Sequence, residues 1–279
     1  IQSFPNAVQT MLDPADCGPA CISLCQDIQG QTFEYPEEFF KERIHSIRRP
    51  RPDDFQIKEA AEKIKKSKNP IIISGGGVFY SNAMEELSNF ATKHNIPVTQ
   101  TVMGYSTMKR DHSHYAGQIG GLGGKNTNDL AKETDLAIAV GTKLADFTTG
   151  SWANFENEKF KLVSINVSRF DANKHLAQAV VGDAKVSLIE LSKALGDWKV
   201  GDEWNEKSQR ELKIWNEHID KESAPTNQEV PSYVQVIGAI YRNSEPTDIA
   251  VTAAGGLVGE VVQVWRPKEL NTHESEWGF

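Results

Sequence analysis

The segment best suited to chemistry is a glycine-rich turn that follows a short apolar run. Residues 70–74 read Pro-Ile-Ile-Ile-Ser, and Gly75, Gly76 and Gly77 come directly after them. A turn of this kind before a helix brings backbone N–H groups close to an anion, so it could hold a phosphate. No Walker lysine follows, and Tyr80 stands where a dinucleotide motif has its third glycine. A tight turn from strand to helix is the competing interpretation.

Histidines and cysteines that could bind a metal are present but poorly grouped. Residues 111–114 read Asp-His-Ser-His, and Cys17, Cys21 and Cys25 recur at intervals of four. The histidine pair lacks a third ligand and the cysteines lack a fourth, whereas structural zinc sites use four. We therefore predict no bound metal. We instead expect residues 20–25 to form a buried strand in which cysteine acts as a small apolar side chain.

A second strand-and-turn pattern lies near the end of the sequence. Residues 248–253 read Asp-Ile-Ala-Val-Thr-Ala, and the small residues Ala254, Gly255 and Gly256 precede Leu257. The pattern matches that of residues 70–77, which indicates that a further α/β unit opens here.

Apolar periodicity around these turns predicts the elements that position them. Helical spacing of apolar residues predicts helices after Asp53, from Met84, near Asn128 and through Leu188. Buried strands are predicted at residues 71–74, 97–102, 136–140, 161–166 and 179–181. Strands that alternate with helices imply a parallel sheet covered on both faces, so the fold class is a Rossmann-like, doubly wound α/β domain.

Ligands of such sheets bind at the carboxyl ends of the strands. The loops after Ser74, Val102, Val140 and Ile165 should therefore form one rim. Residues 103–126 form a long glycine-rich loop beside it. Loops of that length inside a compact domain are usually functional or mobile.

Composition excludes several classes of partner. The formal charge is −8 and the pI is about 5.5, which argues against binding to nucleic acid. No apolar stretch reaches the roughly 18 residues that span a membrane, and no signal peptide is evident. Three cysteines, an odd and low number, favour a reducing compartment. We predict a cytoplasmic protein without nucleic-acid or membrane partners.

The sequence divides into a predicted complete domain between two incomplete ones. Residues 31–53 are rich in proline and charge, and Arg48, Arg49 and Arg51 are expected to be solvated, with phosphate binding as the weaker alternative. The predicted parts are the end of a first domain (1–30), a linker (31–53), the central Rossmann-like domain (54–200), a helix with a linker (201–230) and the start of a third domain (231–279).

Several short motifs, in this order, resemble the thiamine-diphosphate-dependent enzymes related to acetohydroxyacid synthase and pyruvate decarboxylase. The motifs are Gly18-Pro19 with Asp27, Asn69-Pro70 to Gly77, Asp111-His112 to Gly123, Thr134-Asp135 to Gly141-Thr142, Asp146, and Val180 to Ala184. The resemblance implies a pyrimidine-binding domain, a central domain and a diphosphate-binding domain in that order. Residues 1–30 and 231–279 would then be parts of the outer two.

Within that family, residues 11–20 and 251–257 are similar to a member that hydrolyses a C–C bond of a cyclic 1,2-diketone in myo-inositol catabolism. The resemblance implies thiamine diphosphate and Mg²⁺ as cofactors, a small-molecule cyclic diketone as substrate and a homo-oligomeric parent enzyme. It also makes Ala254, Gly255, Gly256 and Leu257 candidates for partial contact with the diphosphate, because small residues let the backbone approach phosphate oxygens. A turn without a ligand explains the same four residues.

The same resemblance implies that this chain is an inactive internal fragment. The family's cofactor-activating glutamate would precede Ile1, and its Gly-Asp-Gly…Asn motif for Mg²⁺ would follow Phe279. We therefore name no catalytic residue and expect this fragment alone to bind no cofactor.

Three other functions stay open. The parent could be an acetohydroxyacid synthase-like enzyme or a 2-oxoacid decarboxylase. The central domain could bind FAD or ADP, although His94-Asn95 stands where an acidic ribose-binding residue is expected, which favours a purely structural domain. An NAD-dependent oxidoreductase would need a catalytic pair at the rim, and the sequence shows none.

Overall fold

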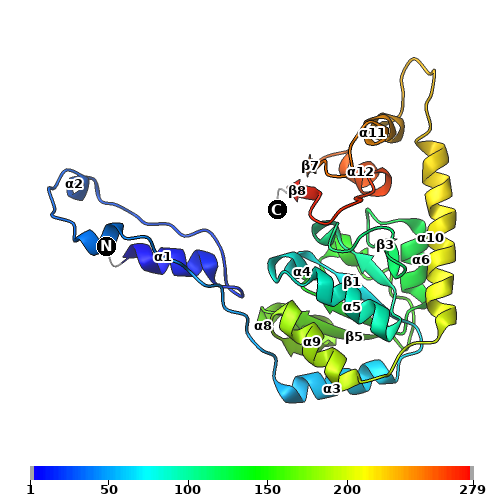
Figure 1. Cartoon of the computed structure of the whole chain (residues 1–279), viewed down its shortest axis with the longest axis horizontal. Helices are drawn as coiled ribbons and strands as arrows, with labels where there is room; N and C mark the ends of the chain where they lie inside the picture. Colours follow the sequence, from blue (N-terminus) through cyan, green and yellow to red (C-terminus); the bar gives the residue numbers. More distant parts are fainter. Residues whose placement is uncertain (1–2, 277–279) are drawn as a thin grey trace.

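A computed structural model describes residues 3–276 and has six parallel strands at its centre (Figure 1). The strands are β1 (Pro70–Ser74), β2 (Val98–Gln100), β3 (Tyr115–Gln118), β4 (Leu136–Val140), β5 (Lys161–Asn166) and β6 (Gln178–Val181). Their order is β3-β2-β1-β4-β5-β6, and all neighbours are parallel. The order reverses between β1 and β4, the point at which doubly wound sheets bind ligands. The predicted Rossmann-like α/β fold is confirmed.

Two groups of helices cover the two faces of this sheet. One group contains α3 (Asp54–Lys65), α5 (Met84–His94) and α9 (Ala184–Leu195), where α3 and α5 each pack against α9; the other contains α6 (Lys125–Glu133) and α10 (Asp202–Glu222). Every residue of β1 and β4 is buried as a result. α3 begins after Asp53 as predicted, and Asp53 caps it, because its Oδ1 accepts a hydrogen bond of 2.8 Å from the backbone N–H of Phe55.

The strand predictions succeed best in the middle of the sheet. β4 and β5 have the predicted bounds, whereas β2 is shorter than residues 97–102. β3 lies inside the predicted glycine-rich loop, where no strand was expected. It has only four residues, and Gly117 within it has a φ of +112°, so neither its length nor its composition indicates a strand.

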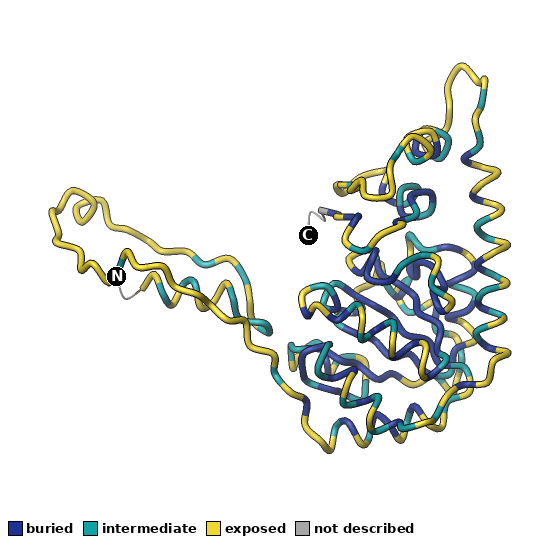
Figure 2. The backbone as a smooth tube through the Cα atoms, in the orientation of Figure 1, coloured by how far each residue is buried: buried dark blue, intermediate teal, exposed yellow. Residues whose placement is uncertain are grey.

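Residues 3–51 form an N-terminal arm that extends away from the sheet (Figure 2). Most of its residues are exposed, and none is buried. It contains α1 (Ser3–Leu12), α2 (Gln26–Gln29) and the short 3-10 helix η1 (Glu37–Phe40). The predicted buried strand at residues 20–25 is wrong. That segment has no regular structure, and Cys17, Cys21 and Cys25 are exposed free thiols. A strand needs a neighbour for its backbone hydrogen bonds, and the described part of the arm offers none.

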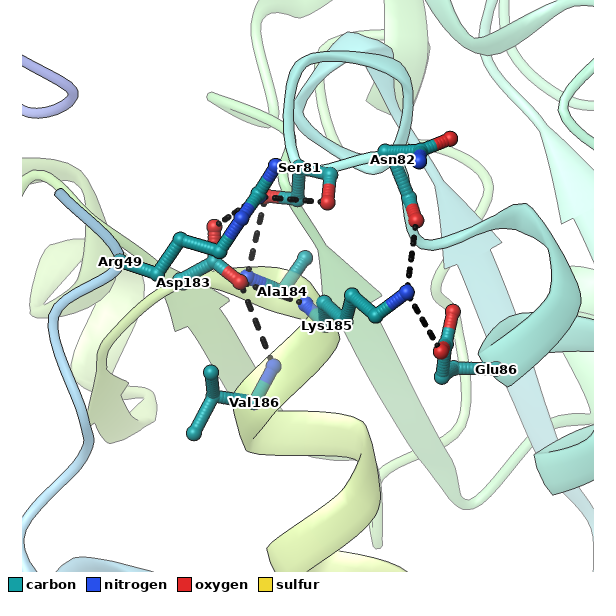
Figure 3. A network of polar contacts seen from close by, with 8 residues as sticks. All are labelled: Arg49, Ser81, Asn82, Glu86, Asp183, Ala184, Lys185 and Val186. Carbon is teal, nitrogen blue, oxygen red and sulfur yellow. Dashed lines mark hydrogen bonds and ion pairs between the residues drawn. The ribbon is translucent and has the colours of Figure 1, made fainter. Parts of the chain in front are cut away.

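A network of polar contacts fixes the arm to the central domain (Figure 3). Arg49 donates hydrogen bonds to Oδ2 of Asp183 at 2.9 Å and to the backbone oxygen of Ser81 at 2.5 Å. Asp183 is buried, and its other oxygen caps the start of α9. The backbone N–H of Asp183 also donates to the carbonyl of Pro50 at 2.8 Å. Arg48, Arg49 and Arg51 are exposed, as expected, but each also forms an ion pair, and that of Arg49 reaches the buried carboxylate of Asp183.

A C-terminal unit lies next to the carboxyl ends of β1 to β3 (Figure 1). It consists of α11 (Tyr233–Arg242), β7 (Ala250–Ala253), α12 (Val258–Val264) and β8 (His273–Glu276). β7 and β8 form a two-stranded parallel sheet of their own. No helix in residues 3–276 is both long and apolar enough to cross a lipid bilayer.

Candidate functional site

The glycine turn after β1 packs against the loop after β4. The N–H of Gly77 donates to the carbonyl of Gly141 at 2.9 Å, and the N–H of Gly75 donates to that of Val140 at 2.9 Å. A Cβ atom at Gly77 would lie 2.6 Å from the Cα of Gly141, so only glycine permits this approach. Two of the N–H groups considered for phosphate binding are thus used within the protein. The turn serves backbone packing at the point where the strand order reverses.

A 3-10 helix, η2 (Val102–Gly104), closes the same region from the side of β2. A Cβ atom at Gly104 would lie 2.1 Å from the backbone oxygen of Ser74. The hydroxyl groups of Ser74 and Thr107 are 2.8 Å apart in this buried layer. Backbone and small polar side chains of the chain itself therefore occupy the space beyond β1, which favours a structural role over a nucleotide cradle at this turn.

The C-terminal unit packs against residues 103–124, the part of the predicted glycine-rich loop (103–126) that precedes α6. The Tyr105 hydroxyl contacts the backbone oxygens of Trp265 at 2.5 Å and Val262 at 3.0 Å. The side-chain amide of Gln263 donates to the carbonyl of Leu122 at 2.6 Å. An ion pair of 2.6 Å joins Lys109 and Glu269. These contacts give the predicted functional or mobile loop an ordered role as a docking surface for α12.

The histidines of the predicted H-x-H pair make local contacts. Nε2 of His114 lies 2.9 Å from Oδ1 of Asn95, and Nδ1 of His112 accepts from the N–H of His114 at 3.2 Å. Burial lowers the pKa of both imidazoles. Within residues 3–276, no group of three or more His, Cys, Asp or Glu side chains is arranged to hold a metal ion.

The predicted cofactor loop lies between β7 and α12. Ala254, Gly255, Gly256 and Leu257 are all exposed. Gly255 has a φ of +153°, and a Cβ atom at Gly255 or Gly256 would meet no other atom within 4 Å. The loop therefore has an open backbone that an anion could approach, in contrast to the closed turn after β1.

A small pocket of about 60 Å³ separates the turn after β1 from β8. Gly76, Tyr80, Met103, Tyr105 and His273 are among its lining residues. Ligand pockets usually exceed roughly 300 Å³, so this space suits water molecules better than a cofactor.

His273 and Tyr105, which line this pocket, also contact each other. Their rings meet edge to face, with centroids 4.8 Å apart. Burial lowers the pKa of His273 to about 4, and its Nε2 atom is buried without a hydrogen-bond partner in the described structure. The sequence gives no sign of this pair, since neither residue belongs to a short motif and the two lie far apart in the sequence.

Comparison with known sequences defines the class of this fold. Residues 57–191 match the family described as thiamine pyrophosphate enzyme, central domain. That range contains all six strands of the central sheet, whereas α10 follows it. Residues 57–191 thus belong to the central-domain family of the thiamine pyrophosphate enzymes.

Individual relatives extend the similarity beyond that domain. Three such relatives, from Clostridium tetani, Clostridium botulinum and Bacillus velezensis, are named 3D-(3,5/4)-trihydroxycyclohexane-1,2-dione hydrolase. They are 36%, 37% and 34% identical to this chain. The alignments cover 98%, 98% and 100% of this chain but 46%, 46% and 47% of the relatives. The chain spans about half the length of the curated relatives it matches.

Proposed function

We propose that this chain is part of a thiamine-diphosphate-dependent hydrolase that opens trihydroxycyclohexane-1,2-dione, a cyclic 1,2-diketone. The observation that carries the proposal is identity of 34–37% over at least 98% of the chain to hydrolases of that name. The similarity includes the arm and the C-terminal unit, which lie outside the central domain. The general family alone would leave acetohydroxyacid synthase-like and decarboxylase activities equally open.

Hydrolysis between two neighbouring carbonyl groups converts one carbon to a carboxylate and the other to an aldehyde. When bound, thiamine diphosphate supplies a nucleophilic carbon and an acceptor for the electron pair of the broken bond. The residues described here fit one edge of such a cofactor, because the open Ala254–Leu257 loop presents backbone between a strand end and a helix. They include no cluster of acidic ligands for Mg²⁺. The other cofactor contacts would come from further parts of the enzyme or from a second subunit.

The central domain then has a structural role. It would hold the pyrimidine-binding part through the Arg49–Asp183 ion pair and the diphosphate-binding part through the loop of residues 103–124. These contacts support separate outer parts at residues 1–30 and 231–279, on either side of the central domain. The exposed free cysteines support a cytoplasmic location, where thiols stay reduced.

The test uses the longer polypeptide that carries this chain. We expect it to add one water to the cyclic diketone, detected as a mass gain of the product, only when thiamine diphosphate and Mg²⁺ are both supplied. Pyruvate serves as the matched alternative substrate. Turnover of pyruvate without turnover of the diketone would contradict the proposed substrate, and cofactor-independent hydrolysis would contradict the mechanism. Residues 1–279 alone are expected to show no turnover.

A further inference from the structure

Tyr105 contacts α12, which follows the Ala254–Leu257 loop, and β8, the strand that pairs with β7 before the loop. It follows η2 and is 2% exposed. Its hydroxyl lies 2.5 Å from the backbone oxygen of Trp265 and 3.0 Å from that of Val262, at the end of α12. Its ring meets that of His273, on β8, at 4.8 Å and an angle of 90°. One side chain of the central domain thus touches α12 through its hydroxyl and β8 through its ring.

These two contacts limit where the loop can lie. β7 pairs with β8 from Ala250–His273 to Ala253–Glu276, and the loop begins directly after β7. It ends where α12 begins, at Val258. The loop itself has little packing of its own, since nothing lies within 4 Å of a Cβ placed at Gly255 or Gly256. Its position is therefore set by the elements on either side.

Arg110 orients the Tyr105 hydroxyl toward α12. Its guanidinium is 3.4 Å from the hydroxyl oxygen and donates to Oδ1 of Asn216 at 2.7 Å. A guanidinium can only donate, so the hydroxyl accepts from it and keeps its own hydrogen for the carbonyls of α12. The carbonyl of Val262 lies in the last turn of α12 and that of Trp265 at its C-cap, where no helical N–H is available to them.

We propose that Tyr105 is a positioning residue that holds the Ala254–Leu257 loop in place for the diphosphate of the cofactor. The cofactor part of this inference rests on the proposed function; the docking part rests on the contacts alone. Substitution by phenylalanine keeps the ring contact with His273 and removes the hydrogen bond to α12. Tyr105→Phe therefore tests the hydroxyl without changing the ring.

The docking part is tested on residues 1–279 by hydrogen exchange and mass spectrometry. Tyr105→Phe should speed exchange in peptides from residues 254–264 about tenfold, while β1 and β4 exchange as in the unchanged protein. Tyr115→Phe is the matched control, because it removes a hydroxyl from a second buried tyrosine and keeps the ring that lies 5.6 Å from the Arg110 guanidinium. Equal exchange of residues 254–264 in the two variants would overturn the docking role.

The cofactor part is tested by titrating the longer polypeptide with thiamine diphosphate in the presence of Mg²⁺. Tyr105→Phe should raise the apparent Kd about tenfold, and saturating cofactor should restore most of the turnover; Tyr115→Phe should leave the Kd unchanged. Faster exchange with an unchanged Kd would overturn the positioning role. Failure of the unchanged enzyme to bind thiamine diphosphate would instead overturn the proposed function, and the exchange result would still decide whether Tyr105 docks α12.

Discussion

Residues 70–77 and 250–257 have the same local pattern in different surroundings. Each is a short apolar strand followed by a turn of small residues and a helix. β1 is buried along its whole length, whereas residues of β7 alternate between partly and fully exposed. A Cβ atom at Gly75 would lie 2.4 Å from the carbonyl oxygen of Gly141, but one at Gly256 would meet nothing within 4 Å. Neighbouring strands, rather than the local sequence, decide whether such a turn is closed by packing or open to a ligand.

The sharpest way to test this difference is to add one methyl group to each turn. Gly75→Ala should cost more than about 4 kcal/mol or prevent folding, because the new Cβ would overlap backbone atoms at a buried strand end. Gly256→Ala, the matched control, should change the free energy of unfolding by less than about 0.5 kcal/mol. Urea unfolding followed by circular dichroism measures both. Similar losses in the two variants would show that the second turn is also closed.

The strands themselves should differ almost as much. Ile72→Ala removes a fully buried side chain from β1 and should lower the free energy of unfolding by about 4 kcal/mol. Val251→Ala removes a side chain that is 71% exposed on β7 and should cost less than about 0.5 kcal/mol. The same unfolding measurement compares them. A loss for Val251→Ala that approaches the loss for Ile72→Ala would mean that another surface covers β7 in solution.

Acid should loosen the C-terminal unit before the central sheet. An unfolded histidine binds a proton near pH 6.5, whereas burial lowers the pKa of His273 to about 4. Between these values the unfolded state binds more protons, so stability falls as the pH is lowered. The full pKa shift of His273 corresponds to about 3 kcal/mol in the free energy of unfolding. Because local opening of β8 lets His273 bind a proton before the whole protein unfolds, the loss should be about 2 kcal/mol.

His273→Gln isolates this contribution, because burial also lowers the pKa values of His94, His112 and His114. When the pH is lowered from neutral to about 4, the free energy of unfolding should fall less in the variant than in the unchanged protein. The difference should be about 2 kcal/mol. Equal losses in the two proteins would assign the acid sensitivity to the other histidines, and His273 would then not report on docking of β8.

Much of the central sheet could be predicted because its strands carry their own signal. β4 is a continuous apolar run, and β5 has three apolar residues among its six; apart from Lys161 both strands are buried, and their bounds follow from the sequence. The error at residues 20–25 has the opposite cause: an apolar run indicates a strand, but no described segment pairs with it. The roles of residues 103–124 could not be predicted either. Tyr105 gains its partners Val262, Trp265 and His273 from the far end of the chain, and no local pattern encodes that contact.

The unit that begins with residues 70–77 is also held by the side chain of Arg49. Removing the Arg49 contacts should have the smallest effect of the changes considered. Arg49 bridges the end of α4 (Gly76–Tyr80), through the carbonyl of Ser81, to Asp183 at the start of α9. Arg49→Met leaves that buried carboxylate with its backbone donors from Lys185 and Val186, so the loss should be about 1 kcal/mol. Arg48→Met is the matched control, since Arg48 is 73% exposed and its ion pair should contribute little.

Proteolysis near residues 45–52 should also become faster in Arg49→Met alone, because the arm would lose the contact that fixes its exit from the domain. Equal cleavage rates in the two variants would show that the hydrogen bond from Asp183 to Pro50 is enough to hold the arm.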